Sequence, residues 1–550
     1  MKCPGATLPA PVPGAQTLPR PLRPLLAGLL PLLAACTAAP VGLDQVLESE
    51  LDELRWHWGD LHAHSAWSFD GCENPELDCI HDAAGPASAF FERAEAVGLD
   101  FAALTDHAEP DLYRYAADEL HPTGATLDIW QGQQLSVVQA EGGPVLPLLG
   151  YEWTANHNAG NTDGPGTHRT VLLGADRACP AYRVAGRSLP PDGHLPEVGE
   201  RAFLQEDRPI LPSPYSLWQA LDEAILAPGC EPLRWLSFAH HPAYLNPQQT
   251  DWSDPENAPH REQLVEIHSE HGSSECFDPE AEGCDFALNH EQGYAPRGSV
   301  QAALDRGFQL GFVGGTDSHD SHPGSVEDGP SRVAQWSDEA PYELIQQFAP
   351  GGLTGVFAPE PLDRERLFEA LSARRTLASS GPRLELHAWA VGRNGDRYLP
   401  GELIPRWNMP VGLVLVLGEL DPRGEHRWED FEEVVIERIA SGGRIVSFGS
   451  GEAFGDSWEP QPDESWTYLR VRLLRGEAST GYPSLLGEER IWLSPWFTDA
   501  PSGCSAAPAG PPILWPLLVL LLAQRAKRTR ATASQASASS AGPIQAQRPG

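Results

Sequence analysis

The sequence is poor in positive charge. Its 550 residues include 38 lysines and arginines against 76 aspartates and glutamates, which gives a formal net charge of −38. Residues 1–35 and 505–550 contain no acidic residue and carry three and five basic ones, so the segment between them carries −46. Such a charge repels nucleic acid and anionic lipid at long range. We therefore expect no nucleic-acid partner for this segment.

Two common catalytic motifs are also absent. No GxSxG nucleophile motif and no phosphate-binding P-loop occurs at the strand ends predicted below, and no internal repeat is evident. The remaining composition is that of a globular protein, since 41% hydrophobic and 21% charged residues exclude a wholly disordered chain. At about 150 residues per domain, the length allows two to four domains.

No CxxC pair occurs, which argues against a cysteine-rich zinc site. Three of the nine cysteines, Cys3, Cys36 and Cys504, lie in the terminal segments and leave six. An even number of cysteines in an exported chain favours disulfides. Local pairing gives three bridges, which join Cys72 to Cys79, Cys179 to Cys230 and Cys276 to Cys284.

The N-terminus has the layout of a signal peptide. Basic residues precede the apolar run from Leu25 to Leu33, which is too short to span a bilayer, and small residues follow it. Leu33-Ala34-Ala35-Cys36 resembles the lipobox of bacterial lipoproteins. We predict a lipoprotein-type signal peptide over residues 1–35 and a linker over 36–54. An ordinary signal peptide with an incidental cysteine is the alternative.

The C-terminus has the layout of an anchor or a sorting signal. Gly503-Cys504-Ser505 precedes the apolar residues 512–523, and a basic cluster follows them. This layout resembles the C-terminal sorting tail of myxobacterial surface proteins, and the alternative is a permanent transmembrane anchor. We therefore predict a sorting or transmembrane tail over residues 499–550. The predicted location is the cell envelope or surface, with the membrane reached through the N-terminal lipid, the C-terminal tail or both.

Short apolar runs recur between Trp56 and Gly381, each followed by a polar cluster. These runs cover residues 101–104, 145–149, 235–238, 264–267 and 310–313. Helical patterns at residues 87–97 and 300–306 alternate with them, which is typical of a parallel sheet of βα units. Beyond Gly381 the strands alternate between apolar and polar residues around glycine-rich turns. We expect an α/β domain over residues 55–383 and a smaller β-rich domain over 384–498.

Histidines and acids concentrate at the predicted strand ends. His62 and His64 lie two residues apart, and on an extended segment such residues point to the same side and can converge on one metal ion. An HxH pair alone is weak evidence, because two solvent-facing histidines are common. The other candidates at strand ends or in the following loops are Asp70, Asp106, His107, Glu152, His168, His240, His241, Asp317 and His319. Together they supply more ligands than one ion can take.

Several separated motifs carry a family resemblance. Residues 58–70 read WGDLHAHSAWSFD, residues 104–107 read LTDH, and residues 314–319 read GGTDSH. These resemble the first, second and last motifs of the PHP (polymerase and histidinol phosphatase) superfamily. Further motifs resemble one bacterial branch of it, which is described only as a domain of unknown function: GYEWT at 150–154, HR at 168–169, EIHSEHGSSE at 266–275 and ASSGPR at 378–383.

The resemblance implies a fold and a ligand set. The fold would be a distorted (β/α)7 TIM-like barrel, followed here by the β-rich domain. One metal would take His62, His64, Glu152 and Asp317. A second would share Glu152 and add His168 and His240, with His241 as the alternative to His240, and a third would take Asp70, His107 and His319. Asp106 would orient a histidine rather than bind the metal.

The chemistry of such a site is hydrolysis. Two or three divalent ions, which the mixed ligands allow to be zinc, manganese or iron, would create hydroxide at working pH. We expect an exported metal-dependent hydrolase that acts on a small phosphorylated substrate, that is, a phosphoesterase. Arg169 and Arg383 could bind the phosphate or pair with carboxylates. Glu266, Glu270 and Glu275 could contact substrate or bind calcium, or could lie in a solvated loop.

Two other functions stay open from the sequence. The first is metal-dependent hydrolysis of an amide or a carboxylic ester, because related metal barrels cleave these bonds too. The second is a surface binding protein without activity that keeps the barrel as a scaffold. The near-complete ligand set argues against this second alternative, because decayed sites usually lose some of their ligands.

Overall fold

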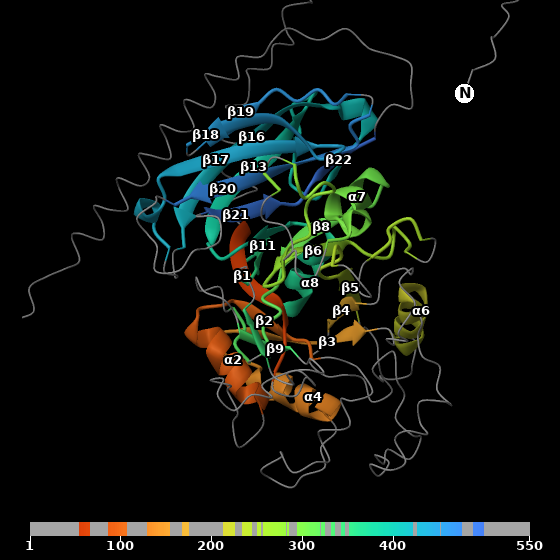
Figure 1. Ribbon diagram of the computed structural model, residues 1–550, viewed down its shortest axis with the longest axis vertical. Helices are drawn as coiled ribbons and strands as arrows, with labels where there is room; N and C mark the ends of the chain where they lie inside the picture. Colours follow the sequence, from red (N-terminus) through yellow and green to blue (C-terminus); the bar gives the residue numbers. More distant parts are fainter. Residues whose placement is uncertain are drawn as a thin grey trace, which may run out of the picture. The chain divides into compact units, whose positions relative to one another are not determined.

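The computed structural model of the chain is shown in Figure 1. It describes residues 54–65, 86–106, 129–154, 168–174, 213–225, 234–244, 250–254, 257–281, 283–284, 294–319, 321–324, 332–335, 343–346, 351–421, 426–451, 453–461, 463–475 and 488–499.

Strands from both halves of the described chain form one large mixed sheet. Its path runs β15-β22-β20-β21-β12-β11-β1-β2-β3-β4-β5-β6-β7, and β8 pairs with β6. The strands before residue 320 are β1 (Leu54–Ala63), β2 (Phe101–Leu104), β3 (Leu146–Thr154), β4 (His168–Leu173), β5 (Trp235–Ala239), β6 (Leu264–Ser269), β7 (Gly272–Ser273) and β8 (Gly311–Gly314).

The later strands of this sheet extend it beyond β1. They are β11 (Leu353–Pro359), β12 (Thr376–Ser379), β15 (Leu403–Ile404), β17 (Glu433–Ala440), β18 (Arg444–Ser450), β20 (Trp466–Leu474), β21 (Glu488–Leu493) and β22 (Trp496–Thr498). β12 pairs with β21, so the sheet continues from the strands before residue 383 into those after it. β17 pairs with β20 on one side and with β18 on the other.

Two smaller sheets and a few helices complete the described structure. The first small sheet has the order β14 (Arg397–Tyr398), β13 (Leu384–Gly392), β16 (Pro410–Leu420) and β19 (Ala453–Asp456); the second pairs β9 (Arg332–Gln335) with β10 (Glu343–Gln346). The α-helices are α2 (Pro86–Ala96), α4 (Ile129–Ala140), α6 (Pro214–Ile225), α7 (Val300–Asp305) and α8 (Arg364–Ser372). Short 3-10 turns cover Pro296–Gly298, Arg406–Asn408 and Trp428–Asp430.

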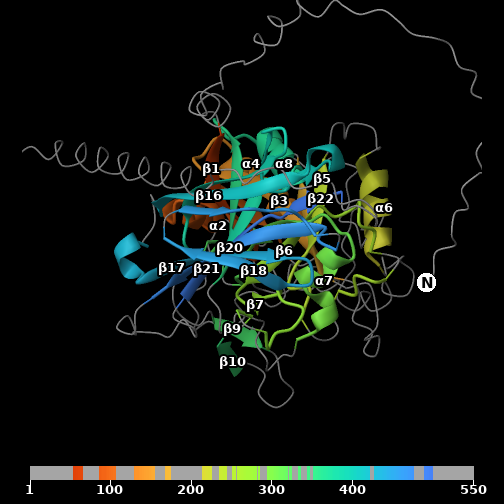
Figure 2. The same cartoon turned by 90° about the horizontal axis from the view of Figure 1, so that it is seen from above.

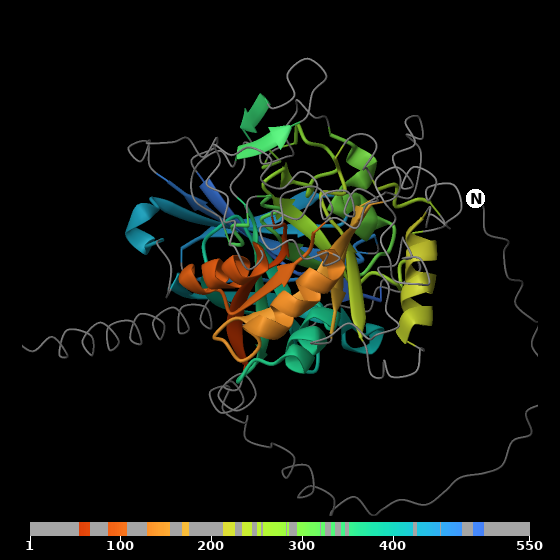
Figure 3. The ribbon, with the colours of Figure 1, turned by 90° about the horizontal axis from the view of Figure 1, so that it is seen from below.

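Two further views, from above and from below, show the C-terminal strands and the helices α2 and α4. Figure 2 shows the blue strands β17, β18 and β20 of the C-terminal region in front. Figure 3 shows α2 and α4 side by side, across the strands drawn in orange.

The sheet is held by buried apolar side chains. Every residue of β2 and β8 is buried, which explains why these runs are apolar throughout. One core cluster joins Trp58 and Leu149 to Leu384, Leu469 and Ile491. Burial of each such side chain contributes about 1.5–3 kcal/mol, so the strands before and after residue 383 stabilise one another.

The expected (β/α)7 TIM-like barrel is wrong. The described residues form 22 strands but only five α-helices, in a β-rich fold with a mixed sheet. β4 is antiparallel to both β3 and β5, and β11 is antiparallel to β1. Strands buried on both faces are apolar throughout in either orientation, so the apolar runs located the strands without giving their direction.

The transmembrane prediction is corrected for the part of the chain that the structure covers. No helix there is long and apolar enough to cross a membrane. Residues 512–523, on which the prediction rested, lie outside the described residues, as does the predicted signal segment. The predicted Cys276–Cys284 disulfide is present, whereas the other two predicted bridges lie outside the described residues.

Candidate metal centre

The predicted ligands gather at one edge of the large sheet. β1, β2 and β3 are parallel to one another, and β5, β6 and β8 run in the same direction, so all six end at this edge. β4 is antiparallel to its neighbours and therefore begins there, which brings His168 to the same edge. The polar residues that follow each apolar run are thus brought together by the sheet.

Four atoms form a compact cage at this edge. His62 Nε2 lies 3.4 Å from Glu152 Oε2 and 3.3 Å from Asp317 Oδ1, and His64 Nε2 lies 3.2 Å from each of the same oxygens. The two imidazole nitrogens are 3.3 Å apart. A tetrahedral ion with ligands at about 2.0–2.1 Å separates its ligand atoms by about 3.3–3.4 Å. The cage therefore has the dimensions of a tetrahedral metal site.

The donor chemistry of the cage fits a metal ion as well. His62 Nδ1 lies 2.8 Å from Glu266 Oε2, and donation to this buried carboxylate directs the lone pair of Nε2 into the cage. Burial alone would lower the pKa of His62, but Asp317, Glu266 and Glu152 together raise it well above its usual value. The three carboxylates therefore make the field around His62 negative, which favours positive charge there, whether that of a proton or of a metal ion.

Glu152 presents its second oxygen to a second group of histidines. Its Oε1 lies 2.6 Å from His168 Nδ1 and 3.3 Å from His240 Nε2. Burial lowers the pKa of His240 to about 3, so its imidazole is neutral and can act as a ligand. Because His240 is the member of the His240–His241 pair that contacts Glu152, the geometry favours it as the ligand of this second position.

Asp317 presents its second oxygen to a residue that the sequence analysis did not assign. Its Oδ2 lies 3.0 Å from His271 Nε2 and 4.0 Å from His241 Nε2. Burial alone would raise the pKa of Asp317, but the imidazoles of His62, His271 and His64 hold it well below its usual value. His271 follows β6 as His240 follows β5, so the strand-end rule used for the other histidines could have found it.

The remaining assigned ligands are only partly described. His319 stacks on His64 with the ring centroids 4.2 Å apart, and its Nδ1 lies 2.7 Å from the carbonyl oxygen of Asp317. Asp70 and His107, its predicted companions at a third metal, lie outside the described residues. His319 therefore lies beside the cage, and its side chain is 10% exposed.

Asp106 supports the edge through hydrogen bonds to its neighbours. It accepts hydrogen bonds from Ser65 N at 2.6 Å, Ser65 Oγ at 2.9 Å and Gln133 Nε2 at 2.7 Å. Ser65 follows His64 directly, so these bonds hold the backbone that presents the HxH pair. The role that the resemblance implies for Asp106, orienting a histidine, stays a prediction; these hydrogen bonds link Asp106 to the residue directly after His64.

The two arginines named as phosphate ligands both contact protein groups. Arg169 is fully buried, with its Nε 2.6 Å from Glu262 Oε1 and Nη2 2.9 Å from Asn257 Oδ1. Arg383 donates to the carbonyl oxygens of Val97 and Gly98. Arg169 thus pairs with a carboxylate, the alternative that the sequence left open, whereas these hydrogen bonds of Arg383 go to backbone carbonyl oxygens.

The glutamates near the disulfide are buried rather than solvated. Glu266, Glu270 and Glu275 are each no more than 2% exposed. Burial raises the pKa of Glu266 to about 7, although His62 opposes this. Glu275 accepts hydrogen bonds from Tyr468 and Trp492 and pairs with Arg470, so it joins the loop after β7 to strands β20 and β21.

Backbone strain coincides with the cluster. Two of the five described non-glycine residues with positive φ are His241, at 29°, and Asp317, at 56°. Gly315 lies under the cage, where an added Cβ would come within 2.6 Å of His62 Cβ. The positive φ angles of His241 and Asp317 cost on the order of 1–3 kcal/mol per residue, and such backbone strain is concentrated at functional sites.

Comparison with known proteins gives two findings. A family model described as a protein of unknown function (DUF3604) matches residues 236–397, which include His240, His271 and Asp317 but not the HxH pair or Glu152. A crystal structure of PsfC from Pseudomonas syringae PB-5123 aligns at 14% identity and a TM-score of 0.28, covering 59% of this chain and 91% of that one. No curated protein matches the chain.

Proposed function

We propose that this chain is a metal-dependent hydrolase whose centre binds at least two divalent ions. The observation that carries the proposal is the cage of His62, His64, Glu152 and Asp317, whose measured separations of 3.2–3.4 Å are those of tetrahedral ligands. The resemblance of the separated motifs to the PHP superfamily supports the same conclusion.

Glu152 joins the first ion position to the second. Its Oε2 faces the cage and its Oε1 faces His168 and His240, so one carboxylate serves both positions. When bound, a pair of divalent ions supplies a nucleophile at neutral pH and stabilises the negative charge that develops as an ester bond breaks. The protein residues hold the ligands in place: Glu266 fixes the orientation of His62, and Asp106 fixes the backbone after His64.

We propose phosphate esters as the substrate class, because paired ions stabilise both the attacking and the leaving oxygen of a phosphoryl displacement. One observation favours a second substrate class. Arg169 and Arg383 both contact protein groups, so neither provides specific evidence for a phosphate. Hydrolysis of an amide or a carboxylic ester is therefore the second candidate.

We propose that the protein acts outside the cytoplasm. The Cys276–Cys284 bridge supports this, because disulfides persist in oxidising compartments and are rare in reducing ones. The predicted signal peptide supports it independently.

The test measures hydrolysis by the purified full-length chain. The protein is stripped with a chelator, reloaded with zinc, manganese or iron, and assayed on chromogenic phosphate monoesters, phosphate diesters, anilides and carboxylic esters. We expect phosphate ester hydrolysis that His64→Ala abolishes and that His260→Ala, a change at an exposed histidine, leaves intact. Activity on anilides or carboxylic esters alone would favour the second candidate, and the absence of stoichiometric metal would exclude both.

A further inference from the structure

Asp317 uses both carboxylate oxygens toward histidines. Its Oδ1 belongs to the cage, whereas its Oδ2 faces His271 Nε2 at 3.0 Å and His241 Nε2 at 4.0 Å. Ligand atoms of these three residues all lie within 4.8 Å of one another. The arrangement on Asp317 parallels that on Glu152, whose two oxygens also face separate imidazole groups.

One nitrogen of the His241 ring, Nδ1, is buried without a hydrogen-bond partner among the described residues. The residue as a whole is 5% exposed. Its Nε2 lies 4.0 Å from Asp317 Oδ2, which is beyond hydrogen-bond distance. A buried imidazole that points at a carboxylate oxygen without reaching it leaves space between them for a shared ligand.

The separations fit an ion between the three side chains. An octahedral ion with ligands at about 2.1 Å places adjacent ligand atoms about 3.0 Å apart and opposite ones about 4.2 Å apart. The Asp317–His271 distance of 3.0 Å and the Asp317–His241 distance of 4.0 Å are close to these two values. Two imidazoles and a carboxylate are a donor set for zinc, manganese or iron.

We propose that Asp317 Oδ2, His241 and His271 bind a further divalent ion, which shares Asp317 with the ion in the cage. This inference rests on the proposed function for the neighbouring cage. The position differs from the third metal implied by the family resemblance, which would use Asp70, His107 and His319. His241 also lies near His168, with ring centroids 5.2 Å apart, but the carboxylate that it faces is that of Asp317.

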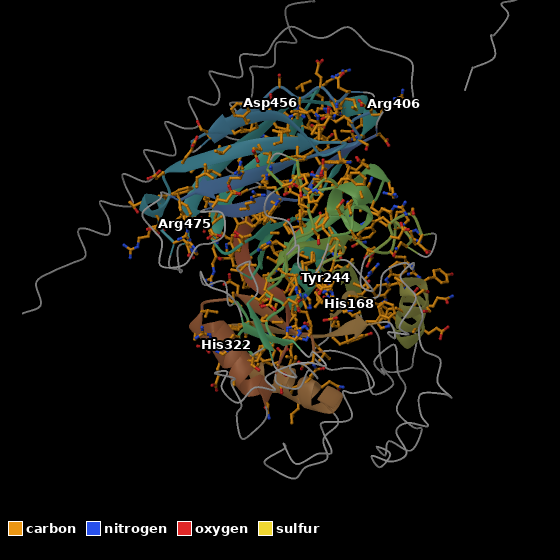
Figure 4. All side chains as sticks on the ribbon, viewed as in Figure 1. His168, Tyr244, His322, Arg406, Asp456 and Arg475 are labelled. Carbon is orange, nitrogen blue, oxygen red and sulfur yellow. A yellow bond between two sulfur atoms is a disulfide. The ribbon has the colours of Figure 1, made fainter. Side chains whose placement is uncertain are left out.

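The proposed position has an open side. The His271 side chain is 14% exposed, and the Tyr244 ring packs 5.6 Å from His271 and 5.3 Å from His241. Tyr244, which is labelled in Figure 4, is partly exposed. Three protein ligands leave coordination positions for water or substrate, as in catalytic rather than structural metal sites.

The experiment measures how many metal ions each chain binds. Chelator-stripped full-length protein is dialysed against zinc, manganese or iron in separate samples, and bound metal per chain is measured for the wild type, His271→Gln, His271→Asp and the exposed control His260→Gln. We expect His271→Gln to bind one ion fewer than the wild type, and His271→Asp, which restores a ligand, to regain it. His260→Gln should match the wild type, and circular dichroism checks that each variant is folded.

The outcomes separate this inference from the proposed function. Equal content of all three metals in the wild type and folded His271→Gln would overturn the third position while leaving the cage intact. If His271→Gln does not fold, the same comparison is made with His241→Asn, and equal content there would overturn the proposal. A wild type without stoichiometric zinc, manganese or iron would instead overturn the proposed function itself.

Discussion

Two buried clusters of charged residues differ in how their charges are matched. The histidine–carboxylate cluster, formed by His62, His64, Glu152, His168, His240 and Asp317, brings carboxylate oxygens against imidazole nitrogens. The arginine–glutamate cluster is formed by Glu275, Glu437, Glu488, Arg470, Arg472 and Arg490. In it Arg470 lies 2.9 Å from Glu275 and 2.7 Å from Glu437, while Glu488 pairs with Arg472 and Arg490.

The two clusters differ in whether cationic side chains neutralise their carboxylates. The arginine–glutamate cluster contains three acids and three bases, so its formal charges cancel. Burial alone would raise the pKa of Glu275, but Arg470 and Arg490 hold it below its usual value. In the cage of the other cluster, two carboxylate oxygens and two imidazole nitrogens face one another. The arginine–glutamate cluster is therefore complete as a structural link, whereas the histidine–carboxylate cluster has the donor atoms that the proposed metal ions would use.

The largest effect is expected from Glu152→Gln. Glu152 serves both ion positions, so its loss removes roughly 5 kcal/mol or more of transition-state stabilisation, on the order of 10⁴-fold in kcat/KM. Steady-state assays on the best phosphate ester measure this change. Because Glu152 is buried against four histidines, circular dichroism and urea unfolding with chelator present check that the variant is folded. Full activity in the variant would contradict the bridging role.

A smaller effect, on stability rather than on chemistry, is expected from Arg470→Met. The substitution leaves Glu275 and Glu437 buried without the base between them, so the free energy of unfolding should fall by about 3–5 kcal/mol. Urea unfolding measures the change, and the loss should be the same with and without chelator. An unchanged unfolding midpoint would show that the arginine–glutamate cluster does not link the loop to β20.

The smallest effect is expected from Glu266→Gln. Glu266 holds His62 through Nδ1, and loss of such a partner typically lowers metal affinity by about 10–100-fold. Competition with a chromophoric chelator measures the affinity, and Glu280→Gln, at an exposed glutamate nearby, is the matched control. Equal affinity in the variant and the control would mean that His62 is oriented by other contacts.

The strand-end candidates were predictable because they follow local patterns. An apolar run marks a buried strand, and the polar residues after it fall at its end, so residues 101–104, 235–238 and 264–267 were placed within one or two residues of β2, β5 and β6. His240 directly follows β5 and Asp317 follows β8, so the same rule predicts that both lie at the ends of strands. His271 follows β6 and so fits the same rule, but its neighbour Glu270 fits it as well, and only Glu270 was assigned a possible role from the sequence.

Strand direction and the partners of buried charges were not predictable. A buried apolar run is the same in a parallel and an antiparallel strand, so the barrel was expected where a mixed sheet exists. Arg169 and Glu275 find partners 93 and 195 residues away, in Glu262 and Arg470. Nothing local to either residue indicates such a partner.

By itself, the sequence determined the acidic character of the chain, the positions of its buried strands and the residue types that can bind metal. These properties are set by each residue and its near neighbours. Only the tertiary structure decided that β4 runs antiparallel and so brings His168 to the edge where β3 ends, two residues after Glu152. It also decided that each of the two carboxylates faces two groups of imidazoles, because such convergence depends on contacts between strands far apart in the chain.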